Sequence, residues 1–67
     1  MSWTNCMKKK IVDHYGSEVQ ECVDGITKDN WEDVLKCMAN VLQITDPETW
    51  IPKQLVLFGE WSLECAF

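Results

Sequence analysis

Apolar residues in the first third of the chain recur at the spacing of one helix face. Over residues 4–24 most lie three or four positions apart, which predicts an amphipathic helix. Thr4 or Asn5 is the expected N-cap, because either side chain can accept a hydrogen bond from a free backbone N–H. The apolar positions are Met7, Ile11, Val12, Tyr15, Val19, Cys22 and Val23.

Gly16 interrupts this pattern and leaves two interpretations open. A glycine inside a helix costs about 1 kcal/mol relative to alanine. Ser17 and Gln20, three residues apart, have the pattern of a capping box. The segment is therefore either one weakened helix or two short helices. Gly25 is expected to end it in a left-handed conformation.

A second amphipathic helix is predicted after this turn. Thr27 or Asp29 is the expected N-cap, and Glu32 follows Asp29 at capping-box spacing. Acidic residues in the first turn suit the positive end of the helix dipole. The helix has one apolar stripe, made of Trp31, Val34, Leu35, Met38, Val41 and Leu42.

The last third of the chain begins with the helix-start signal Asp46-Pro47. Pro52 is expected to kink this helix or to end it and begin a new one over residues 52–58. The run LVLF also fits a short strand. Gly59 is expected to break the segment, and we interpret the remaining residues as helix. The fold prediction is a single all-α domain over residues 1–67, with three or four short helices and disulfide staples.

Composition limits the function classes that this chain can serve. Sixty-seven residues bury only about 60% of their unfolded surface, so such a core usually needs staples. The net charge is −5 and no arginine is present, which argues against nucleic-acid binding. The chain has no apolar run long enough for a membrane span. Residues 8–10 are lysines, which form either a solvated helix face or a small anion contact.

The four cysteines predict structural disulfides. They are separated by 15, 14 and 27 residues, so no C-x-x-C redox or zinc pattern occurs. One alternative is a zinc site made by all four cysteines. Another is catalysis by a cysteine thiol, which would need a histidine as its base, and His14 is the one histidine of the chain. If the first two helices form a long hairpin, Cys6 and Cys37 lie at similar heights, and so the preferred pairing is Cys6–Cys37 with Cys22–Cys65.

The stretch ECVDGITKDNWEDVL, residues 21–35, is similar to the late part of some secretoglobin chains. Cys6 and Cys65 near the chain ends are also similar to the interchain cysteines of that family. The resemblance implies a disulfide-linked helical dimer that holds an apolar ligand. The chain departs from the family in the early position of the match and in Cys37, which lies inside the next helix.

The functional prediction is a secreted, non-enzymatic protein that binds a protein target or receptor, as a signal, toxin, pheromone or inhibitor does. It is expected to use no cofactor and no metal. Its N-terminus has no apolar signal region, so Met1 is expected to begin either a cytosolic protein or a mature domain with an added start. The alternatives are the ligand-carrying dimer and an intracellular module with free thiols. The expected contact surface lies on the tail, at Trp50, Phe58, Trp61 and Phe67.

Overall fold

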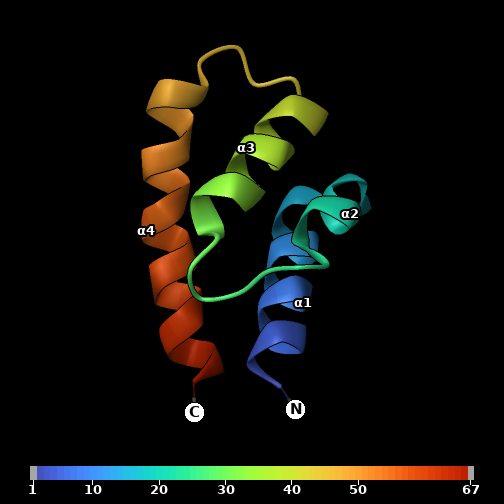
Figure 1. The fold of residues 1–67 in the computed structure, drawn as a ribbon, viewed down its shortest axis with the longest axis vertical. Helices are drawn as coiled ribbons and strands as arrows, with labels where there is room; N and C mark the ends of the chain where they lie inside the picture. The colour runs from blue at the N-terminus through green and yellow to red at the C-terminus, as the bar shows by residue number, and fades with distance from the viewer. Residues whose placement is uncertain (1, 67) are drawn as a thin grey trace.

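The computed structural model describes residues 2–66, which form four α-helices and one short 3-10 helix. This confirms the prediction of a small all-α domain with two disulfides. The long helix α4 runs antiparallel to α1 at one end and to α3 at the other, so the two chain ends lie together (Figure 1). The elements are α1 (Trp3–Tyr15), η1 (Ser17–Val19), α2 (Gln20–Val23), α3 (Trp31–Val41) and α4 (Pro47–Cys65).

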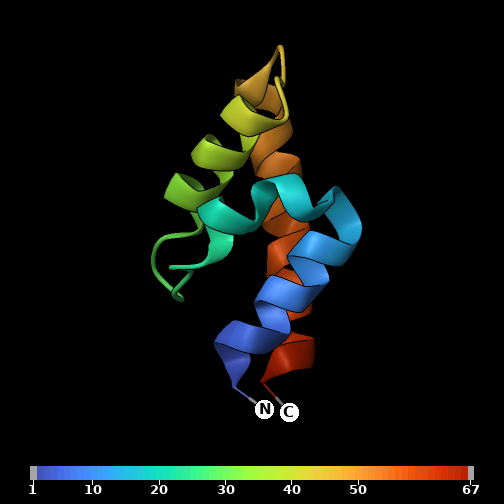
Figure 2. The same cartoon turned by 90° about the vertical axis from the view of Figure 1, so that its right-hand side faces the viewer.

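Gly16 ends α1 and turns the chain, so the two-helix interpretation is correct. Its φ of 101° and ψ of 162° lie in a region that side chains disfavour. Its N–H donates to the Val12 carbonyl at 2.8 Å. The residue expected to be left-handed was Gly25, but positive φ values occur at Gly16 and Gln43 instead. From this turn η1 and α2 cross over to α3 (Figure 2).

Replacing Gly16 with alanine is expected to lower the free energy of unfolding by about 1–3 kcal/mol, because its φ of 101° strains any residue with a Cβ atom. Gly25→Ala is the matched control. Gly25 has ordinary φ, and a Cβ there meets nothing within 4 Å. Urea unfolding of both variants measures the difference. Equal stability of the two variants would contradict the strained turn.

The N-caps differ from those that the sequence predicts. Ser2 caps α1, and its hydroxyl accepts from the Asn5 N–H at 3.1 Å. Asn30, not Thr27 or Asp29, precedes α3. The Asn30 side chain accepts from the Thr27 N–H at 2.8 Å and donates to the Gly25 carbonyl at 2.9 Å. It therefore organises the connection between α2 and α3 instead of capping the helix.

The helix α4 continues through both expected breaks. It begins at Asp46-Pro47 as predicted, but Pro52 and Gly59 lie inside it. Pro52 removes one amide donor to the Glu48 carbonyl, and both residues are exposed to water, which limits the cost. Gly59 is likewise retained in the helix at a cost of about 1 kcal/mol. The predicted break at Gly59 and the alternative strand are therefore wrong.

The core is one apolar cluster to which every α-helix contributes. Phe58 of α4 has no exposed surface and packs edge-on against Trp31 of α3, with ring centroids 6.1 Å apart. The predicted stripes of α1 and α3 supply most of the remainder, although Val41 is 41% exposed. The cluster contains Met7, Ile11, Val19, Val23, Ile26, Val34, Leu35, Met38 and Phe58.

All four cysteines form disulfides within the chain, but the preferred pairing is wrong. The bonds are Cys6–Cys65 and Cys22–Cys37, each with Cα atoms 5.6 Å apart. The expected long hairpin does not exist, because the turn at Gly16 carries α2 across to α3 and brings Cys22 beside Cys37. These bonds also replace the free thiols and the zinc site that were the alternatives.

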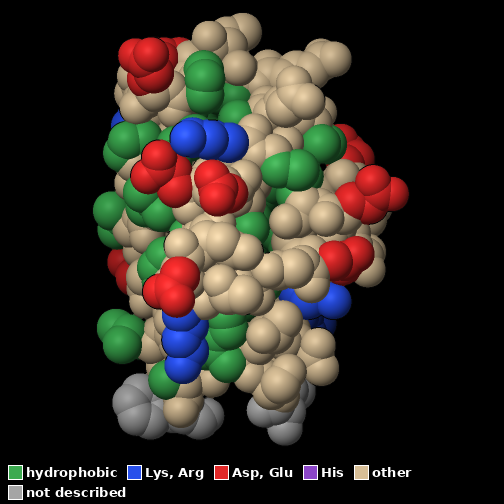
Figure 3. Space-filling view, viewed as in Figure 1, with side chains coloured by type: hydrophobic (Ala, Val, Ile, Leu, Met, Phe, Trp, Pro, Cys, Tyr) green, Lys and Arg blue, Asp and Glu red, His purple; other side chains and the backbone are tan. Residues whose placement is uncertain are grey.

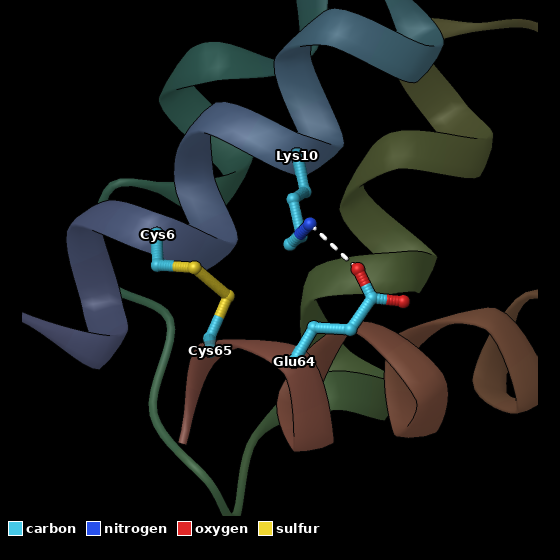
Figure 4. A network of polar contacts seen from close by, with 4 residues as sticks. All are labelled: Cys6, Lys10, Glu64 and Cys65. Atoms are coloured by element: carbon cyan, nitrogen blue, oxygen red, sulfur yellow. Dashed lines mark hydrogen bonds and ion pairs between the residues drawn. A yellow bond between two sulfur atoms is a disulfide. The ribbon is translucent and has the colours of Figure 1, made fainter. Parts of the chain in front are cut away.

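The bond Cys6–Cys65 closes the end of the domain where the termini lie (Figure 4). One turn further along α1, Lys10 forms an ion pair with Glu64 at 2.8 Å. The indole N–H of Trp3 donates to the Ser62 hydroxyl at 3.1 Å on the same pair of helices. The first turns of α1 and the last turns of α4 are therefore held by covalent and polar links.

Candidate binding surface

Three of the four aromatic residues expected to contact a partner take part in packing within the domain. Trp50 and Trp61 are half-buried, and their rings lie 6.0 and 6.2 Å from the Tyr15 ring of α1. Phe58 is fully buried, so it is not part of an exposed surface. Phe67 lies outside the described residues. Trp50 and Trp61 therefore fill the contact between α1 and α4.

Tyr15 is the polar centre of this aromatic contact. Its hydroxyl donates to the Gln54 side-chain carbonyl, and the Gln54 amide donates to the Trp50 carbonyl at 3.3 Å. Burial disfavours the charged phenolate and raises the pKa of Tyr15 to about 12. The raised pKa therefore reflects the packing of the phenol ring against Trp50 and Trp61.

Because Tyr15 is the only tyrosine of the chain, its ionisation can be followed by ultraviolet absorbance. We expect a midpoint near pH 12 in the folded protein and near about 10 in concentrated guanidinium. The folded pKa exceeds the unfolded one, so this stability is complete below about pH 10 and is lost as pH rises to about 12. Tyr15→Phe should abolish the loss of stability that Tyr15 ionisation causes between about pH 10 and about pH 12. A folded-state midpoint near 10 would contradict the buried hydroxyl.

The side of α4 that faces away from the core is also apolar. Val56 and Leu63 are 65% and 66% exposed, and Pro52 lies exposed on the same face. A group of exposed apolar side chains on one side of a helix is a mark of interaction surfaces. The expectation that the tail carries exposed apolar surface therefore holds for α4, but on residues other than its aromatic ones. The spacing of Pro52, Val56 and Leu63 is the signal that could have indicated them.

A groove runs between α3 and the N-terminal half of α4. It comprises two adjoining hollows of about 480 and 400 Å³ that share Lys36, Pro47 and Ile51. Hydrophobic side chains gather along α4 at the left edge of the molecule in Figure 3. The groove rim carries Glu32, Lys36 and Glu48, while its apolar lining consists of Ala39, Ile44, Pro47, Ile51, Pro52 and Leu55.

The exposed charge is strongly acidic once ion pairs are considered. Four of the eleven carboxylates and four of the six lysines pair with one another within residues 2–66. Seven carboxylates and two lysines form no ion pair there. Each lysine of residues 8–10 has a carboxylate partner, which favours the solvated-face interpretation of that cluster. The surface therefore attracts cationic partners.

The described residues offer apolar and acidic surface but no cluster of metal ligands. Among residues 2–66, no group of three or more His, Cys, Asp or Glu side chains is arranged to hold a metal ion. Within the same range, no helix combines the length and apolar character that crossing a bilayer requires. The arrangement can therefore bind through apolar area and negative charge.

Comparisons with protein-family models, curated proteins and solved structures find no match to this chain. The intrachain bond Cys6–Cys65 also departs from the interchain role that the secretoglobin resemblance implies for these cysteines. With all four cysteines bonded within the chain, none is left to link two chains covalently. The function must therefore be inferred from the residues of the surface.

Proposed function

We propose that this protein is a secreted binding protein that engages a basic, partly apolar segment of a protein target or receptor in the groove between α3 and α4. The observation that carries the proposal is the groove itself, whose apolar lining is set in a surface with a large excess of unpaired carboxylates. A signal, toxin or inhibitor works by such a contact, without chemistry of its own.

The groove suits a short amphipathic segment. Pro47, Ile51 and Leu55 follow one another at steps of four along α4, over a length of about 12 Å at 1.5 Å per residue. This length matches about two turns of a helix that lays its apolar side into a groove. Glu48 on the rim would pair with a lysine or arginine beside those apolar anchors, whereas Glu32 already pairs with Lys36 at 3.5 Å.

The two disulfides support an oxidising compartment. Small domains with a marginal core and paired cysteines are typical of secreted proteins, whereas thiols in the cytosol are kept reduced. The large loop closed by Cys6–Cys65 makes this domain especially dependent on that environment. Secretion and receptor binding therefore form one consistent proposal.

Photo-crosslinking tests the groove as the target-binding site. A photoreactive residue replaces Glu48 on the groove rim in one protein and exposed Glu18 of η1 in the control. Both proteins are applied to intact cells of the producing organism, and adducts are identified by mass spectrometry. We expect one adduct from position 48 that is absent from position 18 and is lost when excess unmodified protein is added.

Two charge-reversal variants decide whether a captured protein is the target. Glu48→Lys and Glu18→Lys change the net charge equally and leave the core intact. As unlabelled competitors, Glu18→Lys should displace the adduct as the wild type does, and Glu48→Lys should do so at least about tenfold less well. Equal competition by both variants, or the same adduct from both positions, would overturn the groove proposal.

A further inference from the structure

Apolar and small residues on the outward side of α4 recur at a regular spacing, and most of them do not line the groove. We call this side the outer ridge. Its members follow one another at steps of four, three, four and three, which is the spacing of the facing positions in a coiled coil. They are Pro52, Val56, Gly59, Leu63 and Ala66.

The exposure of the outer ridge shows that the monomer leaves it uncovered. Val56 and Leu63 are 65% and 66% exposed, and Pro52 and Ala66 are exposed as well. Gly59 has open space beside it, since a Cβ would meet nothing within 4 Å. An alanine would suit the helix better by about 1 kcal/mol, and a glycine at this place allows a second helix to approach closely.

We propose that two copies of this chain associate through their outer ridges, with the two α4 helices antiparallel and a two-fold axis between residues 57 and 58. In this register Val56 lies over Gly59 of the second copy, and Leu63 lies against Pro52 of the second copy. Each large side chain thus meets a smaller or flatter neighbour. The proposal is independent of the target-binding groove, although Pro52 borders both surfaces.

Charge complementarity selects this arrangement. Lys53 and Glu60 are exposed, lie seven positions apart on the same flank of the outer ridge, and have no ion-pair partner within residues 2–66. The antiparallel register brings Lys53 of each copy beside Glu60 of the other, which makes two equivalent pairs. Antiparallel helix dipoles also attract one another.

A parallel pairing explains less of the sequence. It would place Gly59 opposite Gly59 of the second copy and leave a gap in the middle of the seam. It would pair Lys53 with Glu48 of the second copy, but Glu60 would have no partner. The two pairings therefore predict different effects of changing Glu60.

The size of the ridge predicts a weak dimer. It covers one face of α4 over residues 52–66, about 21 Å of helix, which is at the low end of specific interfaces. The association should therefore be reversible and concentration-dependent. The two target-binding grooves lie toward the N-terminal halves of the α4 helices, so they would sit at opposite ends of the dimer.

Sedimentation velocity of the purified, disulfide-intact protein tests the association without any target. We expect the mass to rise from 7.8 kDa toward twice that value as protein concentration increases, and Val56→Glu should hold it at the monomer. A wild-type protein that stays monomeric up to millimolar concentration would overturn the proposal. Because no target is present, that result would leave the groove proposal unaffected.

Charge-swap variants test the register. In the antiparallel dimer Lys53→Glu and Glu60→Lys each set like charges together and should each weaken self-association at least about fivefold. Mixing the two single variants should restore association as a heterodimer, and the double variant Lys53→Glu with Glu60→Lys should associate as the wild type does. If Glu60→Lys behaves like the wild type and mixing restores nothing, the antiparallel register is wrong. Unchanged circular dichroism of each variant shows that folding is not the cause.

Discussion

Removing the disulfide Cys6–Cys65 is expected to lower the free energy of unfolding by about 4 kcal/mol, against about 3 kcal/mol for Cys22–Cys37. The difference follows from the loops that the bonds close, with sequence separations of 59 and 15 residues. A longer closed loop removes more conformations from the unfolded chain. Guanidinium unfolding of two double variants, Cys6→Ser with Cys65→Ser and Cys22→Ser with Cys37→Ser, measures both costs.

The expected order can be checked even if the less stable variant does not fold. Stepwise reduction of the wild type, followed by thiol labelling and melting of the singly reduced species, compares the same two bonds. Peptide mapping of the unreduced protein should also yield one peptide pair that joins Cys6 to Cys65. A greater loss from opening Cys22–Cys37 would mean that strain or residual structure outweighs loop length.

The secondary structure could largely be predicted from the sequence, because local rules and packing agree in most helices. The stripe of α3 and the start of α4 at Asp46-Pro47 follow from side-chain spacing and backbone chemistry alone. The break at Gly16 was one of two open interpretations. Spacing could not decide between them, because a helix weakened by a glycine and a helix ended by one share the same apolar pattern.

The disulfide pairing and the length of α4 depend on tertiary contacts, which the sequence does not display. Pro52 and Gly59 are unfavourable in a helix, yet Phe58 and Trp61 bury enough apolar surface to keep the helix continuous through both. Once α4 is continuous, Cys65 reaches the first turns of α1. The pairing preferred from the sequence assumed one long hairpin that turns at Gly25, whereas the turn at Gly16 brings Cys22 beside Cys37.

Two of the residues predicted to contact a partner, Trp50 and Trp61, lie on the side of α4 that faces α1. Tryptophans are common at binding hot spots, and this favoured Trp50 and Trp61. Only when α4 is one continuous helix do both tryptophans lie on its side that faces Tyr15 of α1. The outer ridge lies on the opposite side of the helix, where small aliphatic residues take the place of the aromatic ones.

Replacing Phe58 with alanine is expected to lower the free energy of unfolding by about 3–5 kcal/mol, the usual cost of emptying a fully buried aromatic site. Phe58 is 0% exposed, and its ring lies 6.1 Å from Trp31 and 5.8 Å from Trp61. A cavity there removes contacts from α3 and α4 together. Chemical denaturation followed by tryptophan fluorescence measures this loss.

Val56→Ala is the matched control, because it lies two residues earlier on α4 and is 65% exposed. At low protein concentration it should change stability by less than about 0.5 kcal/mol, while weakening the self-association that the outer ridge supports. If Val56→Ala destabilises the monomer as strongly as Phe58→Ala, the two faces of α4 are assigned the wrong way round. If Phe58→Ala is harmless and Val56→Ala impairs only association, Phe58 is not a core residue and the outer ridge stands without it. The expected pair of results places folding on one face of α4 and self-association on the other.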